Sequence, residues 1–148
     1  MRQPVVMASV YKHETLVDIW TTALTAFYGA VSEAKACNGD TSECTTHTGW
    51  RGTGAYGGNR TPMAIMQVIA ARAAGVTRLV FHTVDSAGAT DFAAACALPG
   101  LDTFRHSETL DPEALLQFCA ARSFRWDTLS ELDSVITFGH ATGATIRM

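Results

Sequence analysis

The stretch that decides the fold reads Thr48-Gly49-Trp50-Arg51-Gly52-Thr53-Gly54-Ala55-Tyr56-Gly57-Gly58-Asn59. Five of its twelve residues are glycine. Glycine adopts positive φ angles without a Cβ clash, so successive backbone N–H groups of such a loop can converge on one ligand. The stretch therefore predicts an anion-binding loop, and phosphate is the anion that it suits best.

The residues after the loop predict a helix that begins close to the same ligand. Thr61 and Pro62 are suited to the N-cap and the first helical position, and an apolar segment follows them from Met63 to Ala74. A helix N-terminus attracts anions through its free N–H groups and its dipole. We therefore expect the loop and this N-terminus to bind one phosphate group together.

The same stretch resembles the diphosphate-binding loop of the poly(ADP-ribose) glycohydrolases, a macrodomain family whose loop reads T-G-N-W-G-C-G-A-F-G-G-D. The identical residues are Thr48, Gly49, Gly52, Gly54, Ala55, Gly57 and Gly58, and Tyr56 replaces one aromatic residue by another. Trp50, Arg51, Thr53 and Asn59 depart from the pattern. The resemblance covers roughly residues 5 to 120 and includes Arg78 to Ser86, which is similar to the family's Y-F-T-F-G-D-S.

The resemblance implies a fold of the α/β class, a partial macrodomain-like three-layer α/β/α arrangement with mostly parallel central strands. It assigns residues 1–122 to that partial macrodomain. Residues 123–148 then form a C-terminal extension, in which 135–138 could add an edge strand and 139–147 is expected to be a loose end. A macrodomain cut in this way leaves an open sheet edge, which invites a complementary macrodomain half or a second copy of the chain.

The resemblance also implies the binding of ADP-ribose or of a poly(ADP-ribose) terminus. The ligand-binding residues that it implies are Gly49, Trp50, Arg51, Gly52, Thr53, Gly54, Ala55, Tyr56, Gly57, Gly58, Thr83 and Asp85. Tyr56 is expected to form an aromatic wall over the sugar and diphosphate, or alternatively to pack on the following helix. Thr83 and Asp85 are expected to face the distal ribose or adenine, although a turn-capping Asp85 is the more common situation.

No catalytic residue is predicted. In the family the catalytic loop is a glycine run followed by Gln-Glu-Glu, located before the strand that here begins near Val5, and this sequence does not contain it. Cleavage of a ribose-ribose bond requires a carboxylic acid that protonates the leaving oxygen. The glutamates all lie beside charged or turn residues: Glu14, Glu33, Glu43, Glu108, Glu113 and Glu131. Three hypotheses remain open: part of an enzyme, a non-catalytic ADP-ribose-binding module, and a degenerate structural remnant.

The composition and charge of the chain argue against two classes of binding partner, nucleic acids and membranes. The chain has 148 residues, is 47% hydrophobic, and carries 11 basic against 14 acidic residues, for a net charge of -3. Since no run of Lys or Arg follows a nucleic-acid backbone, we expect no direct DNA binding. The apolar runs are interrupted by Lys12, Gln67 or Arg72 and are too short to span a membrane.

Cysteine and histidine spacing predicts neither disulfides nor metal. The four cysteines form no C-x-x-C pair, and no secretory signal is recognisable, so reduced thiols in the cytoplasm or nucleus are expected. The five histidines have no metal-ligand spacing, so neither a metal ion nor a cofactor is predicted.

Periodicity predicts the order of elements along the chain. A valine-rich strand at 5–10 precedes a helix whose apolar stripe is Leu16, Ile19, Trp20, Ala23, Phe27 and Val31, with Gly29 near its end. A polar connection at 32–43, a strand at 44–48, the helix to Gly75 and a strand at 79–84 follow, which predicts a parallel strand pair. A turn at 85–88, a helix at 91–98 and a helix opened by Asp111 and Pro112 complete the prediction, with Leu115, Leu116, Phe118 and Cys119 toward the core.

Overall fold

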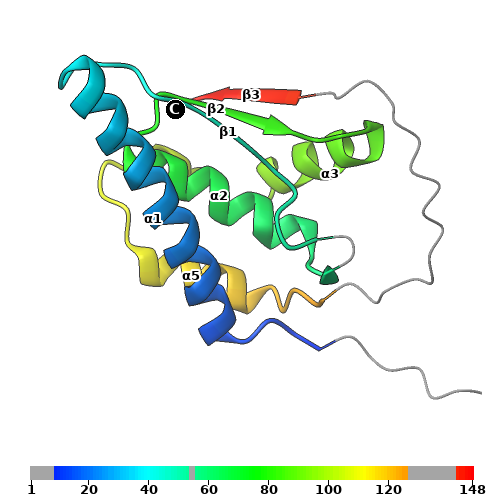
Figure 1. Cartoon of the computed structure of the whole chain (residues 1–148). Coiled ribbons are helices and arrows are strands. Elements are labelled where there is room, and N and C mark those ends of the chain that lie inside the picture. The colour runs from blue at the N-terminus through cyan, green and yellow to red at the C-terminus, as the bar shows by residue number, and fades with distance from the viewer. Residues whose placement is uncertain (1–8, 54–55, 127–142) are drawn as a thin grey trace, which may run out of the picture.

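The computed structural model describes residues 9–53, 56–126 and 143–148, which form a mixed α/β structure. Its elements are α1 (His13–Asn38), β1 (Thr45–Gly49), α2 (Arg60–Ala74), β2 (Arg78–His82), α3 (Ser86–Cys96), α4 (Asp102–His106), α5 (Pro112–Ala121) and β3 (Gly143–Arg147). Figure 1 shows the sheet above a layer of helices, with α1 and α2 beneath the strands. The α/β class is thus confirmed.

The sheet has the order β1-β2-β3. β1 and β2 are parallel, with Thr45 opposite Arg78 and Gly49 opposite His82, so the predicted parallel pair is confirmed. β2 and β3 are antiparallel, with Arg78 opposite Arg147. The three strands therefore include one parallel and one antiparallel pair, rather than the mostly parallel strands expected.

The prediction of a loose end at 139–147 was wrong for its last five residues, Gly143–Arg147, which form β3. Ala144 and Ile146 alternate onto the core, and the backbone pairs with the side of β2 that β1 leaves free. The proposed edge strand at 135–138 lies outside the described residues. The predicted strand at 5–10 is described only at its last two positions, where Val10 forms an isolated bridge with Arg125.

The sheet buries one face. Leu79 and Phe81 are fully buried on the helix side, whereas Arg78, Val80 and His82 alternate with them on the outer side. In Figure 1 the labelled helices all lie on the same side of the strands. The described residues therefore form two layers instead of the three expected.

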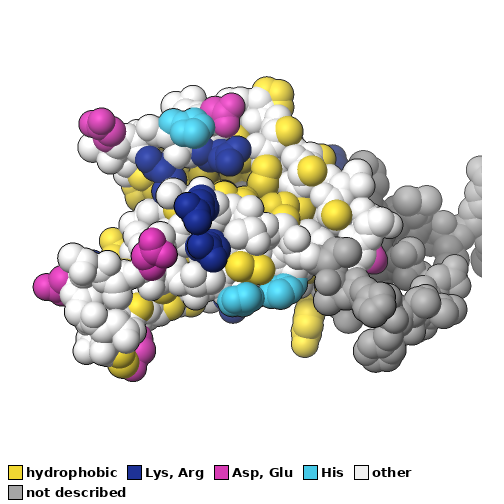
Figure 2. All heavy atoms as spheres, turned by 90° about the horizontal axis from the view of Figure 1, so that it is seen from above, with side chains coloured by type: hydrophobic (Ala, Val, Ile, Leu, Met, Phe, Trp, Pro, Cys, Tyr) yellow, Lys and Arg dark blue, Asp and Glu magenta, His cyan; other side chains and the backbone are white. Residues whose placement is uncertain are grey.

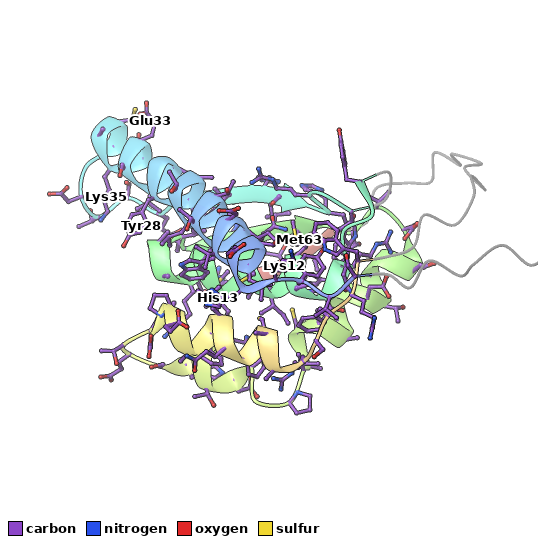
Figure 3. The ribbon with its side chains drawn as sticks, turned by 90° about the horizontal axis from the view of Figure 1, so that it is seen from below. Lys12, His13, Tyr28, Glu33, Lys35 and Met63 are labelled. Carbon is purple, nitrogen blue, oxygen red and sulfur yellow. The ribbon has the colours of Figure 1, made fainter. Side chains whose placement is uncertain are left out.

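Helix α1 has the predicted apolar stripe, with Leu16, Trp20, Ala23, Phe27 and Val31 all buried. The prediction that 32–43 is an irregular connection was wrong for its first seven residues, since α1 continues to Asn38 and contains Gly29 well inside it. Good helix formers fill this last part, where Figure 3 shows Glu33 and Lys35 pointing away from the body. Gly39, at φ 95°, ends the helix.

Helix α2 is buried almost all round, as predicted, and Gly75 ends it in the left-handed conformation. Its buried residues are Pro62, Ala64, Ile65, Met66, Gln67, Val68, Ile69, Ala70, Ala71 and Ala74. The connection from the glycine loop to β2 therefore passes through the centre of the molecule.

The start of α3 corrects one prediction and the start of α5 confirms another. The turn predicted at 85–88 is instead the first part of α3, because the Asp85 carboxylate caps that helix from outside. Asp111 caps α5 as predicted, by accepting from the Glu113 N–H, and Pro112 follows it. Within the described residues, none of the helices has the length and apolar character needed to cross a membrane.

Candidate functional site

The glycine loop leaves the carboxyl end of β1 and folds back on itself. The Arg51 N–H donates to the Gly49 carbonyl at 2.8 Å, and the Gly58 N–H donates to the Gly52 carbonyl at 2.9 Å. Gly52 and Gly57 have φ angles of 66° and 68°, which the loop can adopt cheaply because both are glycine. The predicted use of glycine for positive φ is confirmed at these two positions. Gly54 and Ala55 lie outside the described residues.

Gly58 is required for a different reason. A Cβ at this position would lie 2.0 Å from the Gly52 carbonyl oxygen, far inside contact distance. The two ends of the loop therefore touch backbone to backbone, and the Thr53 hydroxyl donates to the Trp50 carbonyl at 3.3 Å. The loop is a closed unit, and part of its glycine content serves its own packing.

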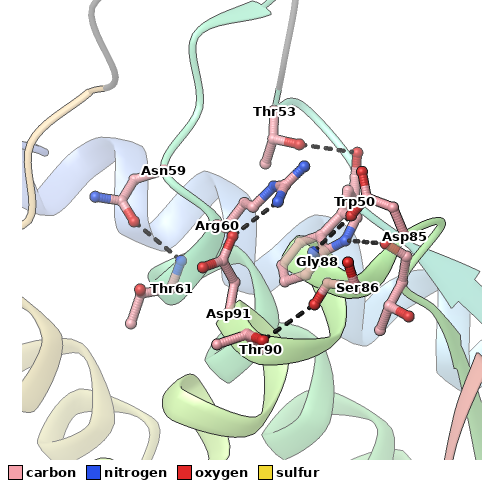
Figure 4. A network of polar contacts seen from close by, with 11 residues as sticks. Trp50, Thr53, Asn59, Arg60, Thr61, Asp85, Ser86, Gly88, Thr90 and Asp91 are labelled. Atoms are coloured by element: carbon pink, nitrogen blue, oxygen red, sulfur yellow. Dashed lines mark hydrogen bonds and ion pairs between the residues drawn. The ribbon is translucent and has the colours of Figure 1, made fainter. Parts of the chain in front are cut away.

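Trp50 connects the carboxyl ends of the two parallel strands (Figure 4). Its indole N–H donates to the Thr83 carbonyl at 3.1 Å, and its ring meets that of Phe81 edge-on at 4.8 Å. The Arg60 guanidinium lies 5.0 Å from the centre of the indole and pairs with Asp91 at 2.7 Å. The structure thus places Trp50, an implied ligand residue, in a packing role between the loop, β2 and α3.

The strand end that the resemblance assigned to the distal ribose or adenine is also occupied by internal contacts. Thr83 is only 1% exposed. Asp85 accepts from the Gly88 N–H at 2.7 Å, so the capping role considered for Asp85 is confirmed. Between them Val84 has a φ of 73°, and the Asp85 N–H donates back to the Thr83 carbonyl at 2.9 Å. This tight γ-turn directs the Thr83 carbonyl toward Trp50.

The N-terminus of α2 differs from the prediction. Its N-cap is Asn59, two residues before the expected Thr61, and the Asn59 side chain accepts from the Thr61 N–H at 2.9 Å. Pro62 has no N–H to offer. The Thr61 N–H is already bonded to the Asn59 side chain. Among the described groups of the first helical turn, the backbone N–H of Arg60 is therefore the one that remains for an anion. The loop, rather than the helix terminus, has to supply most contacts to a phosphate.

A pocket of about 270 Å³ lies between the loop, α1 and α2. Its lining consists of Asp18, Ile19, Thr22, Ala23, Arg51, Gly52, Met63 and Gln67. Gln67 is 2% exposed and fixes the start of the loop, since its amide donates to the Gly49 carbonyl and accepts from the Thr48 hydroxyl. Arg51 is exposed at the rim and is the cation of this lining.

Sequence reasoning missed the α1 wall of this pocket. Asp18 and Thr22 are exposed beside the apolar stripe of α1, and in that position they border the loop. A signal was present, because polar residues at i and i+4 flank the apolar stripe of α1 on one side. The sequence did not show that the glycine loop would lie against that side.

Tyr56 is 82% exposed. It therefore does not pack on the following helix, which corrects the alternative considered for it. Its ring can stack on a planar ligand group or cover a sugar without any rearrangement of the core.

Among the described acids, Asp18 is the carboxylate that lines the pocket beside the loop, and it is exposed. All five described glutamates are exposed, which keeps their carboxyl groups in water: Glu14, Glu33, Glu43, Glu108 and Glu113. Burial raises the pKa of Cys119 to about 12, with Arg122 opposing the shift, and burial likewise raises the pKa of Cys96. Both thiols are therefore protonated and unreactive near neutral pH.

No family model matches the chain, and neither the curated proteins nor the solved structures include a significant match. The described residues define a two-layer α/β protein with a closed glycine loop at the carboxyl ends of two parallel strands.

Proposed function

We propose that this chain binds ADP-ribose, or the terminal unit of poly(ADP-ribose), through the glycine loop, as the diphosphate-binding part of a poly(ADP-ribose) glycohydrolase-like protein. The observation that carries the proposal is the loop itself. Its sequence resembles the family's diphosphate loop, and it leaves the carboxyl end of a strand in a parallel pair, the edge at which open α/β sheets bind ligands.

The surroundings of the loop support a diphosphate ligand. Arg51 and Gly52 line the pocket between the loop and α1, so a guanidinium and a backbone without a side chain meet there. A guanidinium can bind a phosphate through two parallel hydrogen bonds. The exposed Tyr56 supplies an aromatic surface for the sugar or base that continues from the diphosphate.

The proposal does not include hydrolysis by this chain alone. Bond cleavage requires a carboxylic acid held neutral beside the leaving oxygen, and the described glutamates are all exposed. A complementary macrodomain half, or a second copy, could dock on β1, which among the described strands pairs only with β2. Since the four cysteines are free thiols, we place this binding in the cytoplasm or nucleus.

A structural domain that binds no nucleotide is the second candidate. It is favoured by the roles of Trp50, Thr83 and Asp85, whose polar groups are used for packing and for capping α3. If this candidate is right, the family's loop persists here because it packs well, with Gly58 and Gly88 fitting where no larger residue can.

Calorimetric titration of the chain with ADP-ribose, with AMP as the control ligand, separates the two candidates. We expect saturable binding of ADP-ribose and much weaker binding of AMP, which lacks the diphosphate and the second ribose. Arg51→Gln should weaken ADP-ribose binding by about tenfold, the loss expected for one charge-assisted hydrogen bond.

Arg78→Gln is the matched control, because it removes the same charge from the outer face of the sheet. If both variants weaken binding equally, the affinity comes from general electrostatic attraction and the loop is not the site. If the folded chain gives no heat with ADP-ribose, the proposal fails and the structural candidate stands.

A further inference from the structure

Two histidines that lie far apart in the sequence meet on the outer face of the sheet. His47 is on β1 and His82 ends β2. Their rings stack with centroids 5.2 Å apart and planes inclined by 22°, and Nδ1 of His47 lies 2.9 Å from Nε2 of His82. Figure 2 looks down on this face and shows two neighbouring imidazoles (cyan) beside basic side chains (dark blue).

The parallel register explains why the rings meet. Gly49 is opposite His82, and His47 is opposite Val80, so the two histidines are diagonal neighbours on one face. Because Gly49 has no side chain, no group stands directly across from His82, and its ring can lean toward His47. Both side chains are exposed, so an ion can reach them from solvent.

We propose that His47 and His82 chelate a divalent late transition-metal ion through Nδ1 and Nε2. In the metal-free pair one nitrogen donates a hydrogen bond to the other. Metal binding therefore requires the donor ring to change tautomer, its proton moving through water to the other nitrogen of the same ring, so that both lone pairs are free for the ion. Two imidazole nitrogens bound at about 2.0–2.1 Å and at right angles are separated by about 2.9 Å, whereas a tetrahedral angle separates them by about 3.4 Å. The observed 2.9 Å is the length of the hydrogen bond in the metal-free pair, and it places both nitrogens within reach of one ion once the rings turn.

The two imidazole donors define the class of ion, because imidazole nitrogens suit late transition metals. Right-angled nitrogen ligands are typical of Cu²⁺ and Ni²⁺ in tetragonal geometry, and tetrahedral ones of Zn²⁺. Within the described residues no group of three His, Cys, Asp or Glu could hold a metal, so these residues supply two ligands and leave the other coordination positions open. The pair therefore forms an open, exchangeable site and not a structural metal centre. It lies outside the pocket beside the loop and does not depend on ADP-ribose binding.

A positive charge on the same face of the sheet affects the affinity of the histidine pair for a metal cation. Arg78 is on the same face, two residues before Val80, which is opposite His47, so Arg78 is a diagonal neighbour of His47 at about 7–8 Å. Salt screens exposed charges beyond about 8 Å at physiological ionic strength. The positive charge of Arg78 is therefore only partly screened at the site and weakens metal binding, most at low salt.

Titration calorimetry of the untagged chain with NiCl₂ tests the proposal, using His47→Gln, His82→Gln and the control His106→Gln. His106 is exposed on α4, where its Nε2 lies 4.0 Å from the Asp102 carboxylate, so it matches the other two in exposure. We expect one Ni²⁺ per chain, a loss of about 100-fold in affinity in either of the first two variants, and no change in His106→Gln.

Two results would overturn the proposal. One is Ni²⁺ binding that persists at full affinity in both His47→Gln and His82→Gln, which would locate the ion elsewhere, for example at the chain terminus. The other is an equal loss in His106→Gln, which would indicate independent single-histidine binding. Far-ultraviolet circular dichroism of each variant establishes that it is folded before titration, and the exposed positions make unfolding unexpected.

Discussion

Glycines of this chain that look alike in sequence differ in what surrounds them. Gly88, in the first turn of α3, has the Thr83 carbonyl oxygen 2.1 Å and the indole nitrogen of Trp50 2.8 Å from where a Cβ would stand. Gly29, in the middle of α1, has nothing within 4 Å. The first glycine lets the loop, β2 and α3 approach one another, and the second only lowers the helix propensity of α1.

Replacing each of these glycines by alanine should therefore have opposite effects on the free energy of unfolding. Gly88→Ala should lower it by about 1–3 kcal/mol, because the methyl group forces Thr83 and Trp50 apart. Gly29→Ala should raise it by about 0.5–1 kcal/mol through helix propensity. Urea denaturation followed by circular dichroism measures both. Equal changes in the two variants would contradict the close contact at Gly88.

At the scale of elements, the pairing of β3 with β2 places two positively charged side chains opposite each other. Arg78 and Arg147 are direct partners across the antiparallel pair, and both side chains point to the outer face. No ion pair involves either of them among the described residues. Like charges in this position are destabilising, so β3 is held by its backbone bonds and by Ala144 and Ile146 on the core side.

Changing the charge of Arg147 should strengthen the attachment of β3. Arg147→Glu should raise the free energy of unfolding by about 0.2–1 kcal/mol at low salt, because attraction to Arg78 replaces repulsion. Arg147→Gln, which only removes the repulsion, should give an intermediate value, and the differences should shrink at high salt. Denaturant titrations at two salt concentrations check this order. A Glu variant no more stable than the parent at low salt would mean that the two residues are not neighbours.

At the scale of the whole molecule, the described residues give the sheet one core face and one face that none of the described helices covers. Val80 lies half-buried on the outer side of β2, while Val76, just before that strand, is 2% exposed in the helix layer. In a three-layer α/β/α protein both sides would be covered, and residues on either side would be equally sensitive to polar substitution. The two valines therefore test how many layers the protein has.

Val76→Thr should lower the free energy of unfolding by about 1–3 kcal/mol, because it places a hydroxyl in an apolar site. Val80→Thr makes the same chemical change on the outer face and should alter stability by less than about 0.5 kcal/mol. Thermal and urea unfolding of both variants gives the comparison. A large loss in Val80→Thr would reveal a further layer packed over the outer face.

The sequence by itself determined those parts of the protein whose signals are local. The apolar stripe of α1, the all-round burial of α2, the ends at Gly75 and Asp111, and the parallel pairing of β1 with β2 all follow from residues close in the chain. Periodicity, capping and the right-handed crossover act over one or two elements, so they can be read without knowing the rest of the fold.

Only the tertiary structure decided what depends on distant residues meeting. Trp50 has a packing role because Thr83 and Arg60, which are distant in the sequence, lie beside it. Helix α1 lines the pocket because the glycine loop folds against it. The His47 and His82 pair exists only in the register that places Gly49 opposite His82. Strand β3 is likewise a consequence of the free side of β2, since a short exposed strand gains its stability from the partner with which it pairs.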